Sequence, residues 1–361
     1  MKPRCRRRRF KIFLCFTFSL LGYLIWMQEE EAVNRKIASI IADSEMFVYK
    51  IRETVLGVED MKIQLEPCQR KYLQRRVLEV IPSFNPNETL FITKNYKKER
   101  NEALFSIMKV LEVDDDGLVV VDNILQHLPN VNEADRFGSG CKRCVVVGSS
   151  GVLRGQRLGR LIDSYEIVIR MNNAPTRHFS LDVGSKTSFR FLYPESAFSD
   201  AAEYESNSDV VFVVYKGADY DWLNAVLNKS GQAPQIQESR YWKKVPKRFV
   251  SGERVRLLHP YIFTLVKRKH LNIPVKPSIG MIAVTFALHY CDHVDIAGFG
   301  QDSSHTFHYY SIRKRAQSSS FLAGHDWQAE KDHMSRLLRA GVIGRDLTGY
   351  FGTPGNHMDG N

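Results

Sequence analysis

The chain has 361 residues, of which 43% are hydrophobic and 25% are charged, and its formal net charge is +11. This composition excludes wholesale disorder, and the length is sufficient for one large domain or two of common size. The charge alone is compatible with nucleic-acid binding. However, seven of the basic residues lie within positions 1–11, which contain no acid, so that only +4 remains for the rest of the chain. The charge therefore marks the N-terminus and does not indicate a basic folded surface.

An uncharged stretch, residues 12–27, follows this basic tail directly. As a helix it would be about 24 Å long, which is short for an average bilayer and suitable for a thin one. The stretch ends in Trp26 and Met27, where a cleaved signal peptide would need a site of small residues. A buried core helix seldom carries a block of arginines at one end. We therefore predict an uncleaved signal anchor, with residues 1–11 in the cytosol and the remainder in the lumen.

Sequons and cysteines agree with a lumenal location. Asn87 and Asn228 each begin an Asn-x-Ser/Thr triplet and are candidate glycosylation sites. Outside the tail and the anchor four cysteines remain, which suggests two disulfides with three possible pairings: Cys68, Cys141, Cys144 and Cys291. The Cys-x-x-Cys spacing could also be redox-active or bind zinc. Because the second of these cysteines leads into a strand and not into a helix, structural disulfides are favoured.

The remaining elements follow in chain order. Residues 28–66 are polar and helix-prone and are predicted to form a stem, although a first helix of the folded domain is the alternative. Residues 67–361 would form the lumenal catalytic domain. Within it, short apolar strands alternate with helical stretches, and we expect strands at 144–147, 166–171, 210–215 and 294–297 and a buried helix at 280–290. This alternation predicts an α/β, Rossmann-like fold, in which helices cover both faces of a largely parallel sheet.

Glycine loops follow the first and the last of these strands, at 148–151 and 298–300. Ligands of parallel sheets bind at the carboxyl ends of the strands, where these loops fall. Backbone N–H groups and the hydroxyls of Ser149 and Ser150 would suit a nucleotide phosphate. The loop lacks the G-x-G-x-x-G fingerprint and the Gly-Lys of a P-loop, so the sequence supports neither a dehydrogenase nor a P-loop enzyme.

Two other groups of polar residues could bind a metal or take part in catalysis. Asp114 and Asp116 form a D-x-D pattern like that of metal-dependent glycosyltransferases, but they follow a helical stretch and are more typical of a solvated turn, so we predict no metal site. His305, His308 and His325 fall in one polar, aromatic segment. A histidine there could act as a general base towards a hydroxyl or as a cation beside a phosphate.

Four motifs in this order make the chain resemble an animal sialyltransferase, most closely the β-galactoside α2,3-sialyltransferases. The large motif is residues 144–196, the small motif is 277–300, the third motif is His-Tyr-Tyr at 308–310, and the very small motif is His-x4-Glu at 325–330. The resemblance implies transfer of sialic acid from CMP-sialic acid to the 3-hydroxyl of a terminal galactose, in the Golgi, with inversion and without a metal or other cofactor.

The family also implies roles for individual residues. His325 would be the general base, and His308 would contact the donor phosphate. The rest of the donor site would be formed by Ser149, Ser150, Asn172, Ser278, Gly280 and Gly300. The family pattern pairs Cys144 with Cys291, which leaves Cys68 for Cys141. Two positions depart from the usual pattern, since Ser149 stands where many members carry Asn and Ser311 stands where an acidic residue is common.

The sequence leaves several alternative functions open. The same chemistry could act on lactosylceramide, although the sequence Tyr-Pro-Glu-Ser at 193–196 resembles the galactoside 2,3-linkage group. An inactive, membrane-anchored carbohydrate-binding module would bind the donor without turnover. Nucleic-acid binding is disfavoured because most of the excess charge lies in the tail. The acceptor core and the oligomeric state are open.

Overall fold

The computed structural model describes residues 33, 36–37, 39–40, 44, 70–94, 115–129, 140–228, 236–300, 304–312 and 324–352. Within these ranges no helix has both the length and the apolar character needed to cross a membrane. The tail 1–11, the anchor 12–27 and most of the stem 28–66 lie outside the described residues, so the predictions for them remain predictions.

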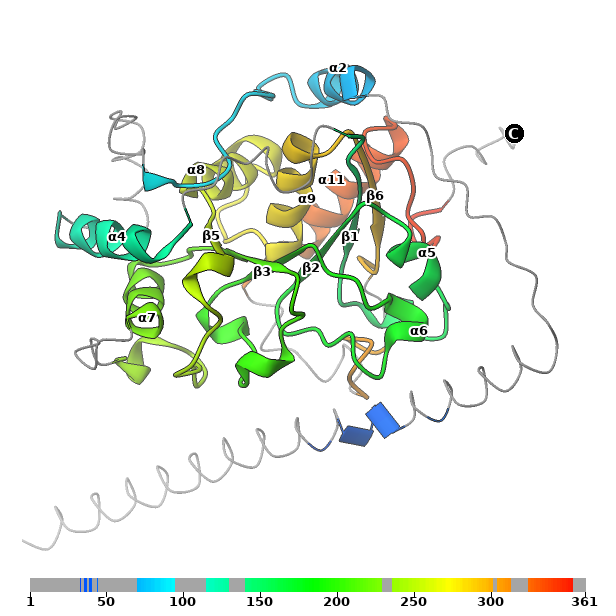
Figure 1. Cartoon of the computed structure of the whole chain (residues 1–361). Coiled ribbons are helices and arrows are strands. Elements are labelled where there is room, and N and C mark those ends of the chain that lie inside the picture. Colours follow the sequence, from blue (N-terminus) through cyan, green and yellow to red (C-terminus); the bar gives the residue numbers. More distant parts are fainter. Residues whose placement is uncertain are drawn as a thin grey trace, which may run out of the picture.

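Six parallel strands form the centre of the molecule (Figure 1). They are β1 (Arg143–Val147), β2 (Ile167–Met171), β3 (Phe189–Leu192), β4 (Asp209–Phe212), β5 (Val255–Leu257) and β6 (His293–Ala297). The strand order is β5-β4-β3-β2-β1-β6, and all the pairings are parallel. The chain thus runs outward from β1 to β5 and then returns to place β6 on the other side of β1.

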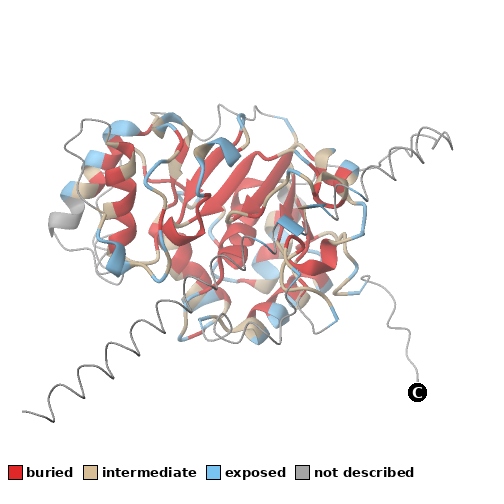
Figure 2. Ribbon diagram, turned by 90° about the horizontal axis from the view of Figure 1, so that it is seen from below, coloured by how far each residue is buried: buried red, intermediate tan, exposed pale blue. Residues whose placement is uncertain are grey.

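Both faces of this sheet are buried, as the red strands in Figure 2 show. Alternate residues of β1 point in opposite directions: Val146 packs into the core beneath α9 (Ile279–Tyr290), whereas Val145 packs into a second core with residues of α5 (Gly159–Asp163) and α6 (Ser180–Val183). Because both faces of the sheet are covered, β1 is apolar throughout its buried part, from Cys144 to Val147. The predicted parallel α/β sheet with helices on both faces is confirmed.

The remaining helices surround the sheet (Figure 1). They are α2 (Arg70–Val80), α4 (Asp115–His127), α7 (Gly217–Leu227), α8 (Pro260–Thr264), a π-helical turn at Leu265–His270, and α11 (Trp327–Arg339). Helices α4 and α7 pack together, and α2 contacts both α9 and α11. Helix α11 begins at the N-cap Asp326, whose side chain accepts a hydrogen bond from the N–H of Ala329.

The sequence missed two strands. In β3, Arg190 interrupts the apolar pattern between Phe189 and Phe191, and β5 has only three residues. Both strands exist because their neighbours supply the hydrogen-bonding partners and the cover, which no local pattern reveals. The strand predicted at 210–215 is shorter than expected and ends at Phe212.

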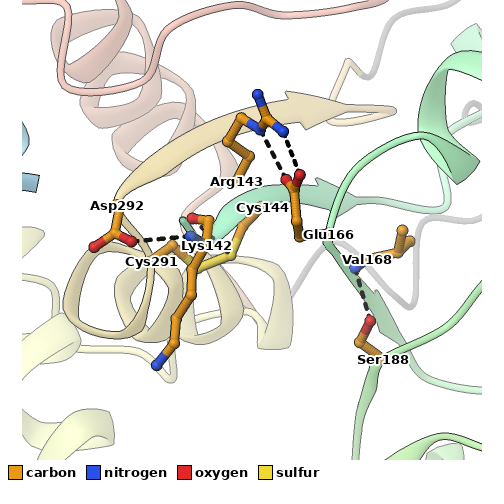
Figure 3. Close-up of a disulfide and its surroundings, with 8 residues drawn as sticks. All are labelled: Lys142, Arg143, Cys144, Glu166, Val168, Ser188, Cys291 and Asp292. Carbon is orange, nitrogen blue, oxygen red and sulfur yellow. Dashed lines mark hydrogen bonds and ion pairs between the residues drawn. A yellow bond between two sulfur atoms is a disulfide. The ribbon is translucent and has the colours of Figure 1, made fainter. Parts of the chain in front are cut away.

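A disulfide joins the start of β1 to the end of α9 (Figure 3). Cys144 and Cys291 are bonded across 147 positions of sequence, with their Cα atoms 6.1 Å apart. Beside it, the N–H of Lys142 donates to Asp292 at 2.9 Å. The pairing that the family resemblance implied is therefore confirmed. Cys141 also takes part in a disulfide, and its expected partner, Cys68, lies outside the described residues.

Candidate active site

A cavity of about 640 Å³ opens at the carboxyl ends of the strands. Residues beyond the ends of five strands line the cavity. Four of them follow their strand directly: Gly148 after β1, Asn172 after β2, Tyr193 after β3 and Gly298 after β6. Tyr215 lies three positions after the end of β4. The cavity includes the point between β1 and β6 where the order of strands reverses. Ligands of open parallel sheets bind at such switch points.

The loops after β1 and β6 touch at this point. The N–H of Gly148 donates to the carbonyl of Ala297 at 2.7 Å, and the N–H of Ser150 donates to the carbonyl of Gly298 at 3.1 Å. The hydroxyl of Ser150 donates to the carbonyl of Gly300. Ser150 therefore lines the cavity but uses its hydroxyl to hold the two loops together. Ser149, which is half-buried, lines the cavity as well.

Substitution of Gly148 by alanine should disrupt this contact. A Cβ atom at Gly148 would lie 2.1 Å from the carbonyl oxygen of Gly298, and neither backbone can withdraw without breaking the hydrogen bonds between the loops. We expect Gly148→Ala to cost about 1–3 kcal/mol of stability, as measured by urea unfolding. Gly140→Ala is the control, because a Cβ there meets nothing within 4 Å. Wild-type stability in Gly148→Ala would contradict this role of the loop contact.

The N-terminus of α9 forms one wall. Ser278 caps the helix by accepting a hydrogen bond from the N–H of Met281 at 3.2 Å. The N–H and the hydroxyl of Ser278 both donate to the carboxylate of Glu330, at 2.7 and 2.6 Å. Burial raises the pKa of Glu330 to about 7, against the opposing effect of these two hydrogen bonds. The free N–H groups of a helix N-terminus favour a bound anion, so this wall suits a phosphate.

Asn172, in the loop after β2, also lines the cavity. Its backbone has a φ of 57°, in the left-handed region that side chains seldom adopt. Its side-chain oxygen is buried and has no hydrogen-bond partner among the described residues. A buried polar atom without a partner is costly, and a ligand that donates a hydrogen bond would satisfy it.

His308 lies within an aromatic cluster on the cavity wall. Its ring stacks on that of Tyr310, with centroids 4.8 Å apart and an angle of 8° between the planes. Tyr309, the middle residue of the motif, points away from the cavity and donates from its hydroxyl to the carbonyl of Pro175 at 2.7 Å. The cluster thus fixes the position of the His308 imidazole. His305 does not line the cavity.

His325 has one ring nitrogen committed and the other available. Its Nδ1 lies 2.8 Å from the carbonyl oxygen of Lys276, and because a carbonyl can only accept, Nδ1 carries the proton. In the neutral ring Nε2 therefore carries the lone pair. Burial lowers the pKa of His325 below its ordinary value, so the ring is neutral at pH 7. This is the state that a general base requires.

A further part of the wall was not found by sequence reasoning. Lys216 forms ion pairs with Glu195 at 2.5 Å and with Asp219 at 3.5 Å, and burial raises the pKa of Asp219 to about 6. Trp242 also lines the cavity and is 59% exposed. Lys216 follows β4 and could have been found from its place after a strand, whereas Trp242 lies in an irregular segment that gives no such signal.

The cavity brings together most of the residues that the sequence singled out. Its lining includes Ser149, Ser150, Asn172, Ser278, Gly280, His308 and His325. Gly300 is not part of the lining, because it lies against the ring of Tyr350 and contributes its carbonyl to Ser150. Within the described ranges no group of three or more His, Cys, Asp or Glu side chains could hold a metal ion. Asp114 and the side chain of Asp116 fall outside those ranges.

A doubly wound parallel sheet with a polar cavity at its switch point defines an α/β protein that binds a ligand at its strand ends. Comparison with known proteins narrows this class. The family model of glycosyltransferase family 29, the sialyltransferases, matches residues 90–342. The chain therefore belongs to glycosyltransferase family 29, which confirms the family that the four motifs indicated.

Its relatives include named enzymes. It is 32% identical over 295 residues to the CMP-N-acetylneuraminate-beta-1,4-galactoside alpha-2,3-sialyltransferase of Homo sapiens, with 76% of each chain covered. It is 32% identical over 303 residues to the CMP-N-acetylneuraminate-beta-galactosamide-alpha-2,3-sialyltransferase 4 of Mus musculus, covering 79% of this chain and 87% of that protein. A crystal structure of a mammalian sialyltransferase in complex with Gal-beta-1-3GalNAc-ortho-nitrophenol superimposes with a TM-score of 0.62 at 27% identity, covering 77% of this chain and 98% of that chain. The prediction of a glycosyltransferase is confirmed.

Proposed function

We propose that this chain transfers sialic acid from CMP-sialic acid to the 3-hydroxyl of a terminal β-galactose, with inversion and without a metal or other cofactor. The names of its relatives support the donor, the galactoside acceptor and the linkage. The observation that carries the mechanism is the hydrogen bond from Nδ1 of His325 to the carbonyl of Lys276, which leaves Nε2 as a base within the cavity.

The proposed reaction is a single displacement. Nε2 of His325 removes the proton of the galactose 3-hydroxyl as its oxygen attacks the anomeric carbon of sialic acid, and the bond from that carbon to the CMP phosphate breaks. The N-terminus of α9 and the imidazole of His308, which line the cavity, would stabilise the negative charge on the departing phosphate. Because CMP leaves as a monophosphate, which carries less charge than a diphosphate, these groups can replace a metal.

The acceptor would contact His325 and Trp242, which both line the cavity. The face of an aromatic ring suits the apolar face of a sugar, and Trp242 offers a large exposed ring within the cavity lining. Lys276 joins the base to the segment after β4, because its carbonyl accepts from His325 and its Nζ donates to the carbonyl of Tyr215 at 3.3 Å.

The activity should fall in acid. Since the base acts when neutral and its folded-state pKa lies below the ordinary value of about 6.5, kcat/KM should rise with pH and level off with a midpoint below about 6.5. Glu330 has a pKa of about 7 and could add a second step. The pH dependence of kcat/KM should therefore also be measured for Glu330→Gln. In this variant only the acidic limb assigned to His325 remains. A profile without an acidic limb would contradict the proposed base.

A transfer assay tests the proposed function. The full chain in detergent is incubated with CMP-sialic acid and a panel of galactose-ended acceptors, including type 1, type 2, O-glycan and lactosylceramide, with and without EDTA. We expect transfer to at least one acceptor and equal rates with EDTA. No transfer to any acceptor would overturn the enzyme assignment in favour of a carbohydrate-binding module, and a loss of activity in EDTA would overturn the metal-free mechanism.

We propose that the protein is located in the Golgi membrane, with a single anchor at residues 12–27 and a catalytic domain in the lumen. The basic tail supports the orientation, and the short span supports a thin membrane. The exposure of Asn87 supports glycosylation at this residue, and we propose it for Asn228, which directly follows α7, as well. We expect peptide-N-glycosidase to increase the mobility of the protein from animal cells, and Asn87→Gln to remove part of that shift. Wild-type protein with no shift would argue against a lumenal domain.

A further inference from the structure

A buried arginine lies directly behind the loop that carries Asn172. Arg190 is in the middle of β3 and has no exposed surface. An arginine seldom occupies a position that is closed on all sides, because its charge cannot be removed from the guanidinium in proteins. Its neighbour in the register of β2 is Arg170, which is equally buried.

The guanidinium of Arg190 makes four hydrogen bonds that divide into two pairs. On one side Nε donates to Glu205 at 3.1 Å and Nη2 donates to the other oxygen of the same carboxylate. On the other side Nη1 donates to the carbonyl oxygens of Asn172 and Ala174, at 2.9 and 3.0 Å. The arginine thus connects a carboxylate to the backbone of the loop after β2.

This connection determines the backbone of Asn172. Its N–H donates to the carbonyl of Phe191 at 2.7 Å, and its carbonyl accepts from Arg190, so β3 holds the residue from both sides. The conformation that results, with φ at 57°, is uncommon for residues other than glycine, and asparagine is one of the few that adopt it. It persists because the surrounding contacts impose it.

Glu205 is itself fixed from the far side. Arg254 donates to the carbonyl of Glu205 and, through Nε, to the carbonyl of Ser208 at 3.0 Å. Arg254, which directly precedes β5, thus holds the backbone of Glu205, and the Glu205 side chain in turn holds Arg190, which binds Asn172. A buried ion pair is often no more stabilising than well-packed apolar residues of similar volume, so stability alone gives little reason for this one.

We infer that Arg190 and Glu205 are positioning residues for the donor site, which hold Asn172 left-handed so that its carboxamide faces the donor. This inference rests on the proposed function, since it assigns the donor to the cavity that Asn172 lines. The carboxamide oxygen is buried without a partner among the described residues, and the donor would supply the missing hydrogen bond. Neither Arg190 nor Glu205 belongs to the cavity lining, so their effect on binding is indirect.

The first test compares two arginines in the full chain in detergent. Arg190→Lys keeps the charge but cannot make all four hydrogen bonds, and we expect the Kd for CMP to rise about tenfold with little change in the KM for the acceptor. Arg170→Lys is the matched control. Arg170 donates to the carbonyls of Lys186 and Val183, away from Asn172, so this variant should lower the Tm without changing the Kd for CMP.

The second test separates positioning from folding. Arg190→Met combined with Glu205→Met removes both charges at similar volume, so we expect the protein to fold, to bind CMP at least about tenfold more weakly and to show Asn172 outside the left-handed region in a crystal structure. Wild-type affinity for CMP in this double variant and in Arg190→Lys would overturn the inference. If the wild-type chain itself fails to bind CMP, the proposed function is wrong and the inference fails with it.

Discussion

Replacing His325 with alanine is expected to lower kcat by about a thousandfold, because the variant loses the base that accepts the proton of the acceptor hydroxyl. Affinity for CMP should change little, since the groups proposed for the phosphate are the N-terminus of α9 and His308. Turnover is measured with saturating donor and acceptor, and CMP affinity by calorimetry.

A second histidine serves as the control for this substitution. His305 lies in the same sequence segment but outside the cavity, where its Nδ1 contacts the hydroxyl of Ser304 at 2.8 Å. His305→Ala should retain near-wild-type turnover. If His325→Ala keeps more than about a tenth of the wild-type kcat, a loss far below that of a removed general base, the proton is accepted elsewhere.

Removal of the Cys144–Cys291 disulfide should have the largest effect on stability. The bond closes a loop of 147 positions, for which the chain-entropy model gives about 5 kcal/mol, and native disulfides typically contribute about 2–5 kcal/mol. It also joins β1, whose following loop lines the cavity, to α9, which supplies cavity residues itself. We expect Cys144→Ala combined with Cys291→Ala to lose stability in this range in urea unfolding and to bind CMP more weakly.

The single variant Cys291→Ala separates the effect of losing the disulfide from the effect of losing side-chain volume. It opens the same loop while leaving Cys144 in place, so it should lose nearly as much stability as the double variant. A decrease in the free energy of unfolding of less than about 1 kcal/mol in both variants would mean that the bond does not constrain the unfolded chain as the model assumes.

The sequence was sufficient to find four of the six strands and several residues of the cavity lining. Strands such as β1 are buried on both faces and read as uninterrupted apolar runs, and the glycine loops that follow β1 and β6 mark the ligand edge. His308 and His325 stood out through the family motifs. No local pattern indicated that Asn172 and His325, which lie more than 150 positions apart, line one cavity, because that depends on the order of the strands.

What the sequence missed depends on tertiary partners. Arg190 would be expected at a surface from its type, and only the carboxylate of Glu205 and the loop carbonyls make its burial possible. Ser150 was expected to face the donor, whereas its hydroxyl contacts the carbonyl of Gly300, 150 positions away. Trp242 lies in a segment without periodic structure, so its exposure within the cavity could not be anticipated.

The central claim is best tested by the structure of the product. The full chain in detergent is supplied with CMP-sialic acid and lactose, and the purified product is examined by NMR. We expect one sialic acid joined to O3 of galactose in the α configuration, inverted from the β configuration of the donor. A product joined to O6, to another sialic acid or in the β configuration would contradict the proposed function.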